Sequence, residues 1–261
     1  MPIAAMIFWL KLILVPSLIG SVSLAGRRWG PIISGWFIAF PLTSGPIVLF
    51  LALEQGDAFA SRAAQGTMMG LISVAAFCLV YSSLAFRLAW FQCFLASCLT
   101  FFASTLVLEL ISIPPMLVFP VVICVLALVS ICLPRRSHLE SHFDFSLWDI
   151  PLRMVAATIL VVLLTESAEL LGPRLSGLLT PFPLFTSVLA IFTHRAQGAD
   201  SVAQLLRGLL VGLFTFAIFF LVVTLTLENS GLITSFAIAS LVSISFHGAT
   251  LVLLRRMNSD D

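Results

Sequence analysis

Few side chains in this sequence could take part in chemistry, and those that could lie within long apolar stretches. Glu166 interrupts one such stretch, and Glu169 follows three residues later, on the same face of a helix. His247 lies inside another apolar stretch near the end of the chain. An ionisable group in apolar surroundings is a candidate for proton transfer. We therefore expect Glu166 and His247 to couple protons to function. The alternatives are carboxylates that reach a membrane interface and a histidine that only packs between helices.

The sequence holds no motif of a known catalytic site. It has no phosphate-binding glycine loop, no zinc-protease motif, no serine-nucleophile motif and no pair of catalytic acids. His138 and His142 have a spacing that can bind a metal, but they lie in a polar segment that we interpret as a solvated linker. We therefore expect no enzyme activity, no cofactor and no bound metal.

The composition places the chain in a membrane. Of the 261 residues, 60% are hydrophobic and 10% are charged, and the mean hydropathy is +1.15. A soluble domain carries roughly 25% charged residues, so this chain cannot form a soluble surface. The basic residues form no patch, which argues against a nucleic-acid partner. The expected surroundings are membrane lipid, and a small-molecule substrate is the expected partner.

Nine segments are apolar over roughly the 20 residues that a membrane-spanning helix needs. They are residues 4–25, 31–53, 64–85, 88–110, 114–133, 150–171, 173–193, 202–227 and 231–254. With the N-terminus outside, ten of the 13 Lys and Arg residues fall on the cytoplasmic side, and two fall outside. Cytoplasmic loops are enriched in Lys and Arg. We therefore expect an outer N-terminus and a cytoplasmic C-terminus.

Two parts of the chain are similar to each other. Residues 30–70 match residues 172–212 without a gap, at an offset of 142, and twelve of the 41 positions are identical. Five spans separate the two copies, so the second copy is inverted in the membrane. Inverted repeats recur in secondary transporters, with the substrate bound between the halves. The expected organisation is a first repeat (1–111), a connector helix with a cytoplasmic linker (112–149), and an inverted second repeat with the tail (150–261).

Prolines are expected to break the second and seventh spans near the membrane midplane. Pro41 lies ten residues into the second span, about 15 Å deep in a core about 30 Å thick. Pro181 and Pro183 lie in the corresponding part of the seventh span. Backbone groups freed by a proline need new partners in hydrocarbon, and a binding cavity can supply them. The alternative is two kinked helices packed by small residues. The expected substrate-binding residues are Pro41, Thr43, Ser44, Gly45, Thr180, Pro183, Thr186 and Ser187.

Polar residues end these two broken spans on opposite membrane faces. Glu54 and Gln55 end the second span, and Gln197 ends the seventh. We expect these three to form gates, and the alternative is a structural helix end at the glycine that follows each. Lys11 and Arg153 occupy equivalent positions in the two copies. Such side chains usually extend to the lipid headgroups, but they could also attract an anionic substrate.

Glycines four residues apart allow close helix packing. Gly66 and Gly70 lie in the third span, and Gly208 and Gly212 repeat the pattern in the eighth. Packing within the chain is the favoured interpretation, and a homodimer interface is the alternative.

Several motifs of the second copy are similar to a known family. They are Leu171-Gly172-Pro173, Ser176-Gly177-Leu178, Phe182-Pro183-Leu184-Phe185, Gln197-Gly198 and Arg207-Gly208. From Leu171 to Gly208, this pattern resembles the GlpM-like group of small bacterial membrane proteins. Those proteins carry the pattern once, whereas this chain carries two copies and a connector. The resemblance implies a bacterial inner (cytoplasmic) membrane protein, and it supplies neither a substrate nor binding residues.

These features predict an all-α polytopic membrane protein with nine transmembrane helices. Two inverted four-helix repeats flank a connector helix, and helices two and seven are broken. The predicted function is secondary transport of a small solute by alternating access, which protons could drive. The alternative is a non-transporting accessory or assembly protein of the membrane.

Overall fold

The computed structural model is all helical in the part of the chain that it describes. It describes residues 2–41, 44–45, 48–49, 52, 56–111, 113–134, 150–156, 158–159 and 182–259. The labelled helices are α1 (Pro2–Trp29), α2 (Pro31–Ile38), α4 (Asp57–Leu84), α5 (Trp90–Leu110), α6 (Pro115–Cys132), α8 (Leu184–Ser230) and α9 (Leu232–Ser259). Residues 150–156 are also helical. The prediction of an all-α fold is confirmed for these residues.

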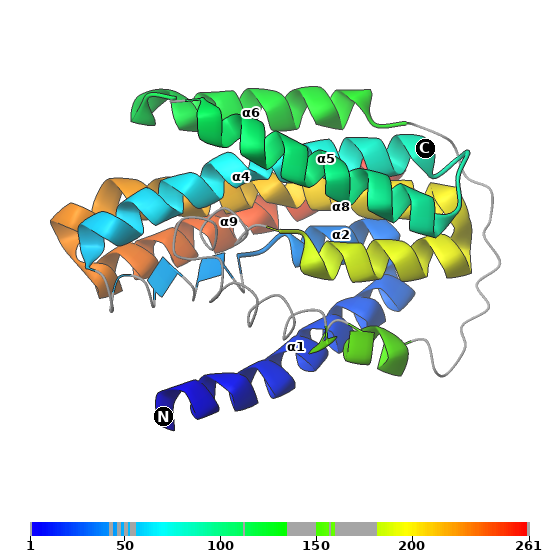
Figure 1. Cartoon of the computed structure of the whole chain (residues 1–261), viewed down its shortest axis with the longest axis horizontal. Helices are drawn as coiled ribbons and strands as arrows, with labels where there is room; N and C mark the ends of the chain where they lie inside the picture. Colours follow the sequence, from blue (N-terminus) through cyan, green and yellow to red (C-terminus); the bar gives the residue numbers. More distant parts are fainter. Residues whose placement is uncertain are drawn as a thin grey trace.

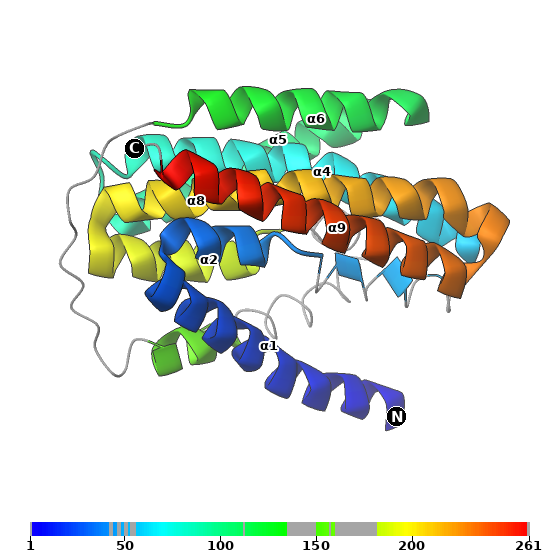
Figure 2. The same ribbon diagram turned by 180° about the vertical axis from the view of Figure 1, so that it is seen from behind.

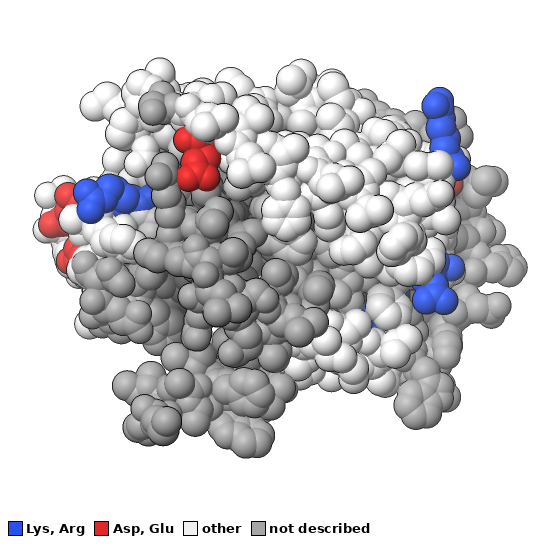
Figure 3. All heavy atoms as spheres, viewed as in Figure 1, with Lys and Arg blue, Asp and Glu red and all other residues white. Residues whose placement is uncertain are grey.

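Five of the described helices are long and apolar enough to cross a membrane: α4, α5, α6, α8 and the part of α9 at Leu232–Leu251. They run along the long axis of the molecule, with α6 and α1 on opposite sides of the bundle (Figures 1 and 2). On the described part of one face, charged side chains gather toward the two ends of this axis (Figure 3). An uncharged middle between charged ends suits a bilayer, and together with the five long apolar helices it identifies a membrane protein. The count of nine spans stays a prediction.

α4 and α8 form the centre of the bundle. In the most apolar window of each of these helices 61% of the residues are buried, against 22% for α5, α6 and α9. α8 packs against α2, α4 and α9, and α4 packs against α5 and α6. The outer helices therefore present their apolar side chains, such as Leu99 on α5 and Ile131 on α6, to the surroundings.

α8 combines the predicted seventh and eighth spans in one element with a sharp reversal. Gly198 has φ 83° and ψ −174°, which are not helical angles. The chain turns back at this point (Figure 1, yellow), so α8 consists of a first limb, residues 184–197, and a second limb, residues 199–230. Gly56, just before α4, has a similar φ of 88°. Glycine adopts such angles without the steric cost of a side chain. The spacing between the two glycines equals the offset between the two copies of the repeat.

α4 begins at Asp57, earlier than the start at residue 64 that hydropathy predicts. The polar residues Asp57 and Arg62 lower the hydropathy of this first part, although both are helical. A carboxylate in the first turn of a helix interacts favourably with the positive end of the helix dipole. Apolar content therefore marks the part of a helix inside the membrane, not the whole helix.

α2 ends where the sequence places a proline. The helix stops at Ile38, and Ala39 and Phe40 donate backbone hydrogen bonds to carbonyls only three residues back, at 3.3 and 3.4 Å. Pro41 has no N–H, and its ring would clash with the carbonyl of Phe37 in a continuous helix. Beyond the proline, the Gly45 N–H donates to the Pro41 carbonyl at 3.0 Å. The predicted break in the second span is therefore present at residues 39–41.

α2 and the second limb of α8 touch through their backbones. A Cβ added to Gly35 would clash with the carbonyl oxygen of Leu205, and one added to Gly208 would clash with the carbonyl oxygen of Ile32. One turn further along, a Cβ on Gly212 would lie 2.9 Å from the carbonyl oxygen of Trp36. Small residues allow helices to approach this closely in membranes. Packing within the chain therefore explains the Gly208–Gly212 motif.

Replacing Gly208 with alanine should destabilise the protein by about 1–3 kcal/mol, because the added methyl group overpacks the contact with Ile32. Unfolding by sodium dodecyl sulfate in mixed micelles measures this free energy. Gly248→Ala on α9 is the matched control, since a Cβ there meets no described atom within 4 Å. Alanine should leave that exposed helical position unchanged or stabilise it by up to about 1 kcal/mol. Equal stability of the two variants would contradict the backbone contact.

Candidate functional site

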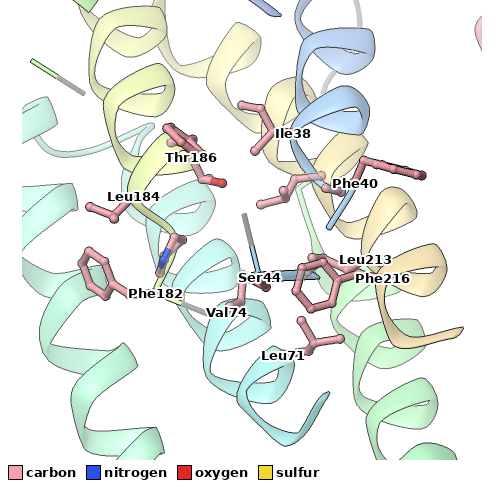
Figure 4. Close-up of a pocket in the computed structure, with 14 residues that line it drawn as sticks. Ile38, Phe40, Ser44, Leu71, Val74, Phe182, Leu184, Thr186, Leu213 and Phe216 are labelled. Atoms are coloured by element: carbon pink, nitrogen blue, oxygen red, sulfur yellow. The ribbon is translucent and has the colours of Figure 1, made fainter. Parts of the chain in front are cut away.

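A cavity lies where the break after α2 faces the start of α8 (Figure 4). Its volume is about 60 Å³, which leaves room for a few water molecules. One wall comes from residues 38–40 and Ser44, and the facing wall comes from residues 182–186. The remaining lining residues lie on α4 and the second limb of α8, and they are Leu71, Val74, Leu209, Leu213 and Phe216. Both proline-containing segments of the repeat therefore border one cavity.

The lining residues include pairs that are related by the sequence repeat. Four pairs of lining residues are separated by 142 positions: Phe40 and Phe182, Ser44 and Thr186, Leu71 and Leu213, and Val74 and Phe216. Each pair takes one residue from each copy, so equivalent positions of the two copies face the same space. Sequence analysis missed the lining residues of α4 and α8, which are Leu71, Val74, Leu213 and Phe216. Their shared offset of 142 was a possible signal, but apolar side chains in a membrane helix look like ordinary packing residues.

The structure brings together part of the predicted substrate-binding set. Ser44, Pro183 and Thr186 line the cavity. Pro41 is buried at the break but does not line the cavity, and Gly45 lies near the ring of Phe219 instead. Thr43 and Thr180 lie outside the described residues.

Ser187, the last member of the predicted set, is fully buried beside the cavity. Its hydroxyl has no hydrogen-bond partner among the described residues, whereas its backbone N–H donates to the Pro183 carbonyl at 2.7 Å. A buried hydroxyl usually has a partner, because removing it from water without one costs free energy. Ser187 is therefore a buried hydroxyl without a partner among the described residues, next to the lining residue Thr186.

The cavity offers apolar and aromatic surface with a few hydroxyl groups. None of its described lining residues is charged. Phe182 is held in place by the rings of Phe101 and Phe102, at centroid distances of 5.1 and 5.6 Å. Two hydroxyls, Ser44 and Thr186, supply polar contacts. Such a lining suits a small neutral or weakly polar solute.

His247 joins three helices close to the break in α2. Its Nδ1 lies 3.0 Å from the Thr215 hydroxyl on α8, and its ring stacks on Trp36 of α2 at a centroid distance of 3.7 Å. The Trp36 indole N–H donates to the Thr250 hydroxyl on α9 at 3.0 Å. The Nε2 of His247 is buried and has no partner among the described residues. Sequence analysis missed Trp36, Thr215 and Thr250, since nothing local in the sequence indicates contacts over such long separations.

The other predicted site residues are only partly covered by the structure. Gln197 is partly buried at the end of the first limb of α8, and its side-chain oxygen has no partner among the described residues. Glu54, Gln55 and Glu166 lie outside the described residues, as does the linker with its two histidines. The gate and proton-coupling roles of these residues stay predictions.

Ser187→Ala should leave the stability unchanged or raise it, because the alanine removes a buried hydroxyl that has no partner. Thr105→Val is the matched comparison, since it breaks the 2.9 Å hydrogen bond between the Thr105 and Ser73 hydroxyls. That loss should cost about 1 kcal/mol. Thermal unfolding in detergent measures both variants. An equal loss of stability in Ser187→Ala would show that its hydroxyl is satisfied in the resting protein.

Comparison with known proteins does not identify this site. Neither protein-family models, nor curated proteins, nor solved structures give a match to this chain. The similarity to the GlpM-like group therefore stays a prediction from the motifs of the second copy, and the function has to be argued from the geometry.

Proposed function

We propose that the protein is a secondary transporter that moves a small solute by alternating access. The observation that carries this proposal is that both proline-containing segments border the cavity of about 60 Å³. In transporters with inverted repeats, interrupted helices meet near the membrane midplane and form the substrate site there. The mostly apolar lining favours a small, weakly polar solute.

The inverted repeat is part of the proposal, and two observations support it. Gly56 and Gly198 occupy equivalent positions of the two copies and share the same unusual backbone conformation. The four lining pairs at the same offset place equivalent positions around one cavity. An axis that relates the two copies would have to pass close to such a cavity. The nine-span topology, with two four-helix repeats and a connector, follows from the same duplication.

We propose a bacterial inner membrane location, with the N-terminus outside and the C-terminus in the cytoplasm. The N-terminus, the start of α4 and the end of α8 lie at one end of the bundle, and the end of α9 lies at the other (Figure 1). This arrangement agrees with the alternation of basic residues along the sequence.

Accessibility of the cavity tests the transport proposal. In a variant whose native cysteines are replaced, Ser44→Cys and Thr186→Cys place one thiol on each wall. A membrane-impermeant thiol reagent should label both positions, and it should reach them from either side of oriented vesicles, because alternating access opens the cavity to each side in turn. Mass spectrometry measures the labelled fraction.

Ser73→Cys is the control, since Ser73 is fully buried between α4 and α5 and should stay unlabelled. Labelling of neither cavity position from either side would refute transport and favour a non-transporting accessory or assembly protein, in which the segments are packed shut.

Proton coupling through His247, together with Glu166, is a separate proposal. The described groups that touch the His247 ring are uncharged: Trp36, Phe40 and Thr215. Protonation would put a positive charge on the face of Trp36, next to the break in α2, and would therefore bias the position of that segment.

Fluorescence of Trp36 tests this proposal in a variant whose other four tryptophans are replaced by phenylalanine. Lowering the pH from about 8 to about 4, which covers the range in which histidine titrates and extends below it, should quench the emission, because a protonated imidazole in contact with an indole accepts an electron from its excited state. His247→Gln should abolish the change. Emission that does not depend on pH before this substitution would remove His247 from the coupling mechanism, whatever the outcome for transport.

A further inference from the structure

The cavity between the broken segments lies between two helix ends of opposite polarity (Figure 4). One wall, residues 38–40, contains the C-terminus of α2, and the facing wall, residues 182–186, contains the N-terminus of the first limb of α8. The aligned peptide groups of a helix act as roughly half a positive charge at its N-terminus and half a negative charge at its C-terminus. The backbone therefore gives the cavity a positive wall and a negative wall, a polarity that its side chains do not show.

The start of α8 has backbone donors that remain available. The N–H groups of Leu184 and Ser187 donate to carbonyls just before the helix, both at 2.7 Å. The N–H groups of Phe185 and Thr186, between these two bonds, have no acceptor among the described residues. Free N–H groups at a helix N-terminus, together with the helix dipole, bind carboxylate oxygens.

The Thr186 side chain is a second, independent indication of a ligand at this helix end. It is only 3% exposed, and its hydroxyl points into the cavity (Figure 4, red). This hydroxyl forms no hydrogen bond with the described residues. Burying a hydroxyl without a partner costs free energy, and a carboxylate oxygen in the cavity would accept its hydrogen bond.

The opposite wall offers hydrogen-bond acceptors. The N–H groups of Ala39 and Phe40 donate to carbonyls only three residues back, so the helix ends at this wall with its carbonyl end. Ser44 adds a hydroxyl, in a side chain that is 3% exposed, and this hydroxyl can accept a hydrogen bond. In transporters with interrupted helices, C-terminal helix ends and freed carbonyls hold cations. A protonated amine suits this wall, since it carries a positive charge and donates hydrogen bonds.

Charge balance and size restrict the solute further. None of the described lining residues is charged, so a solute with a net charge would remain uncompensated away from water. A zwitterion has no net charge, and each of its ends would meet a wall of opposite sign. The cavity volume of about 60 Å³ holds roughly four to six atoms of the size of a water molecule. Free glycine has this size.

We propose that the cavity binds a small zwitterion of the glycine type, with its carboxylate at the start of α8 and its ammonium group at the end of α2. Thr186 donates a hydrogen bond to the carboxylate, and Ser44 accepts one from the ammonium group. The proposal rests on the proposed function, because it names the class of solute that the transporter would carry in the same cavity. The apolar residues of α4 and α8 close the remaining sides, so little room is left for a side chain on the zwitterion.

Equilibrium dialysis of the full-length protein in detergent, with tritiated glycine at neutral pH, tests the site. Glycine should bind with saturation, and unlabelled alanine should compete less well because its methyl group needs additional volume. Acetate and methylammonium each carry only one of the two charged groups, so each should compete at least about tenfold more weakly than glycine. Acetamide, which has a similar size and no formal charge, should compete no better than these two ions.

Thr186→Val keeps the shape of the side chain and removes its hydroxyl, so it should weaken glycine binding by about tenfold. Thr193→Val is the matched control, since Thr193 lies two helical turns further along the same limb and does not line the cavity. This control should bind glycine like the unmodified protein. If Thr186→Val does not fold, Ser44→Ala decides the question, with an expected weakening of about threefold to fivefold.

Absence of saturable glycine binding would overturn the proposal, as would glycine binding that neither Thr186→Val nor Ser44→Ala changes. Competition by acetate or acetamide as strong as that by glycine would also overturn it, because the two walls would then not recognise two charged ends. The cysteine-labelling test is independent of these results. Labelling at positions 44 and 186 from both sides, without glycine binding, would retain transport and exclude the zwitterion. Glycine binding without labelling would retain the site and refute transport.

Discussion

The contact between the backbones of α2 and the second limb of α8 determines where the candidate site lies. Because Gly35 and Gly208 carry no side chain, the two helices approach until carbonyl oxygens occupy the space of a Cβ. This approach places the end of α2 directly against Leu209 and Leu213, so the broken segment is buried inside the bundle and lines a cavity. With larger residues at the glycine positions, the break would be held farther from α8 and the cavity would lose one wall.

Polar contacts on the other sides of α2 complete its attachment, although the helix has only eight residues. Ser34 bonds to α1, and Trp36 bonds to Thr250 and stacks on His247 of α9. In hydrocarbon, the apolar side chains of neighbouring helices gain little from touching each other instead of lipid, so small residues and hydrogen bonds carry more of the packing. The first part of α2 is therefore firmly placed, while the backbone at residues 39–41 leaves the regular helical hydrogen bonding. The fixed part of α2 and the interrupted backbone that follows it therefore lie next to each other beside the cavity.

Much of the helical fold could be predicted from the sequence, but fewer of the contacts at the candidate site could. Apolar segments and prolines predicted the helices and the break near Pro41, because both effects are local to the backbone. The internal repeat pointed to Ser44 and Thr186, which the structure places on one cavity. The sequence could not show that His247 stacks on Trp36 or that Arg27 and Arg153 border one cavity. These contacts depend on which face each helix turns toward helices that are distant in the sequence. The start of α4 at Asp57 was also missed. Hydropathy indicates which residues lie in lipid, and the first residues of α4 are helical but polar.

The backbone contact has a consequence for how this sequence can change in evolution. When a new side chain collides with a neighbouring side chain, a second substitution that shortens the neighbour can restore the fit. At Gly35 and Gly208 the neighbour is a peptide carbonyl, which every residue type carries. No compensating substitution can remove it, so both positions should tolerate only glycine even while the residues around them diverge.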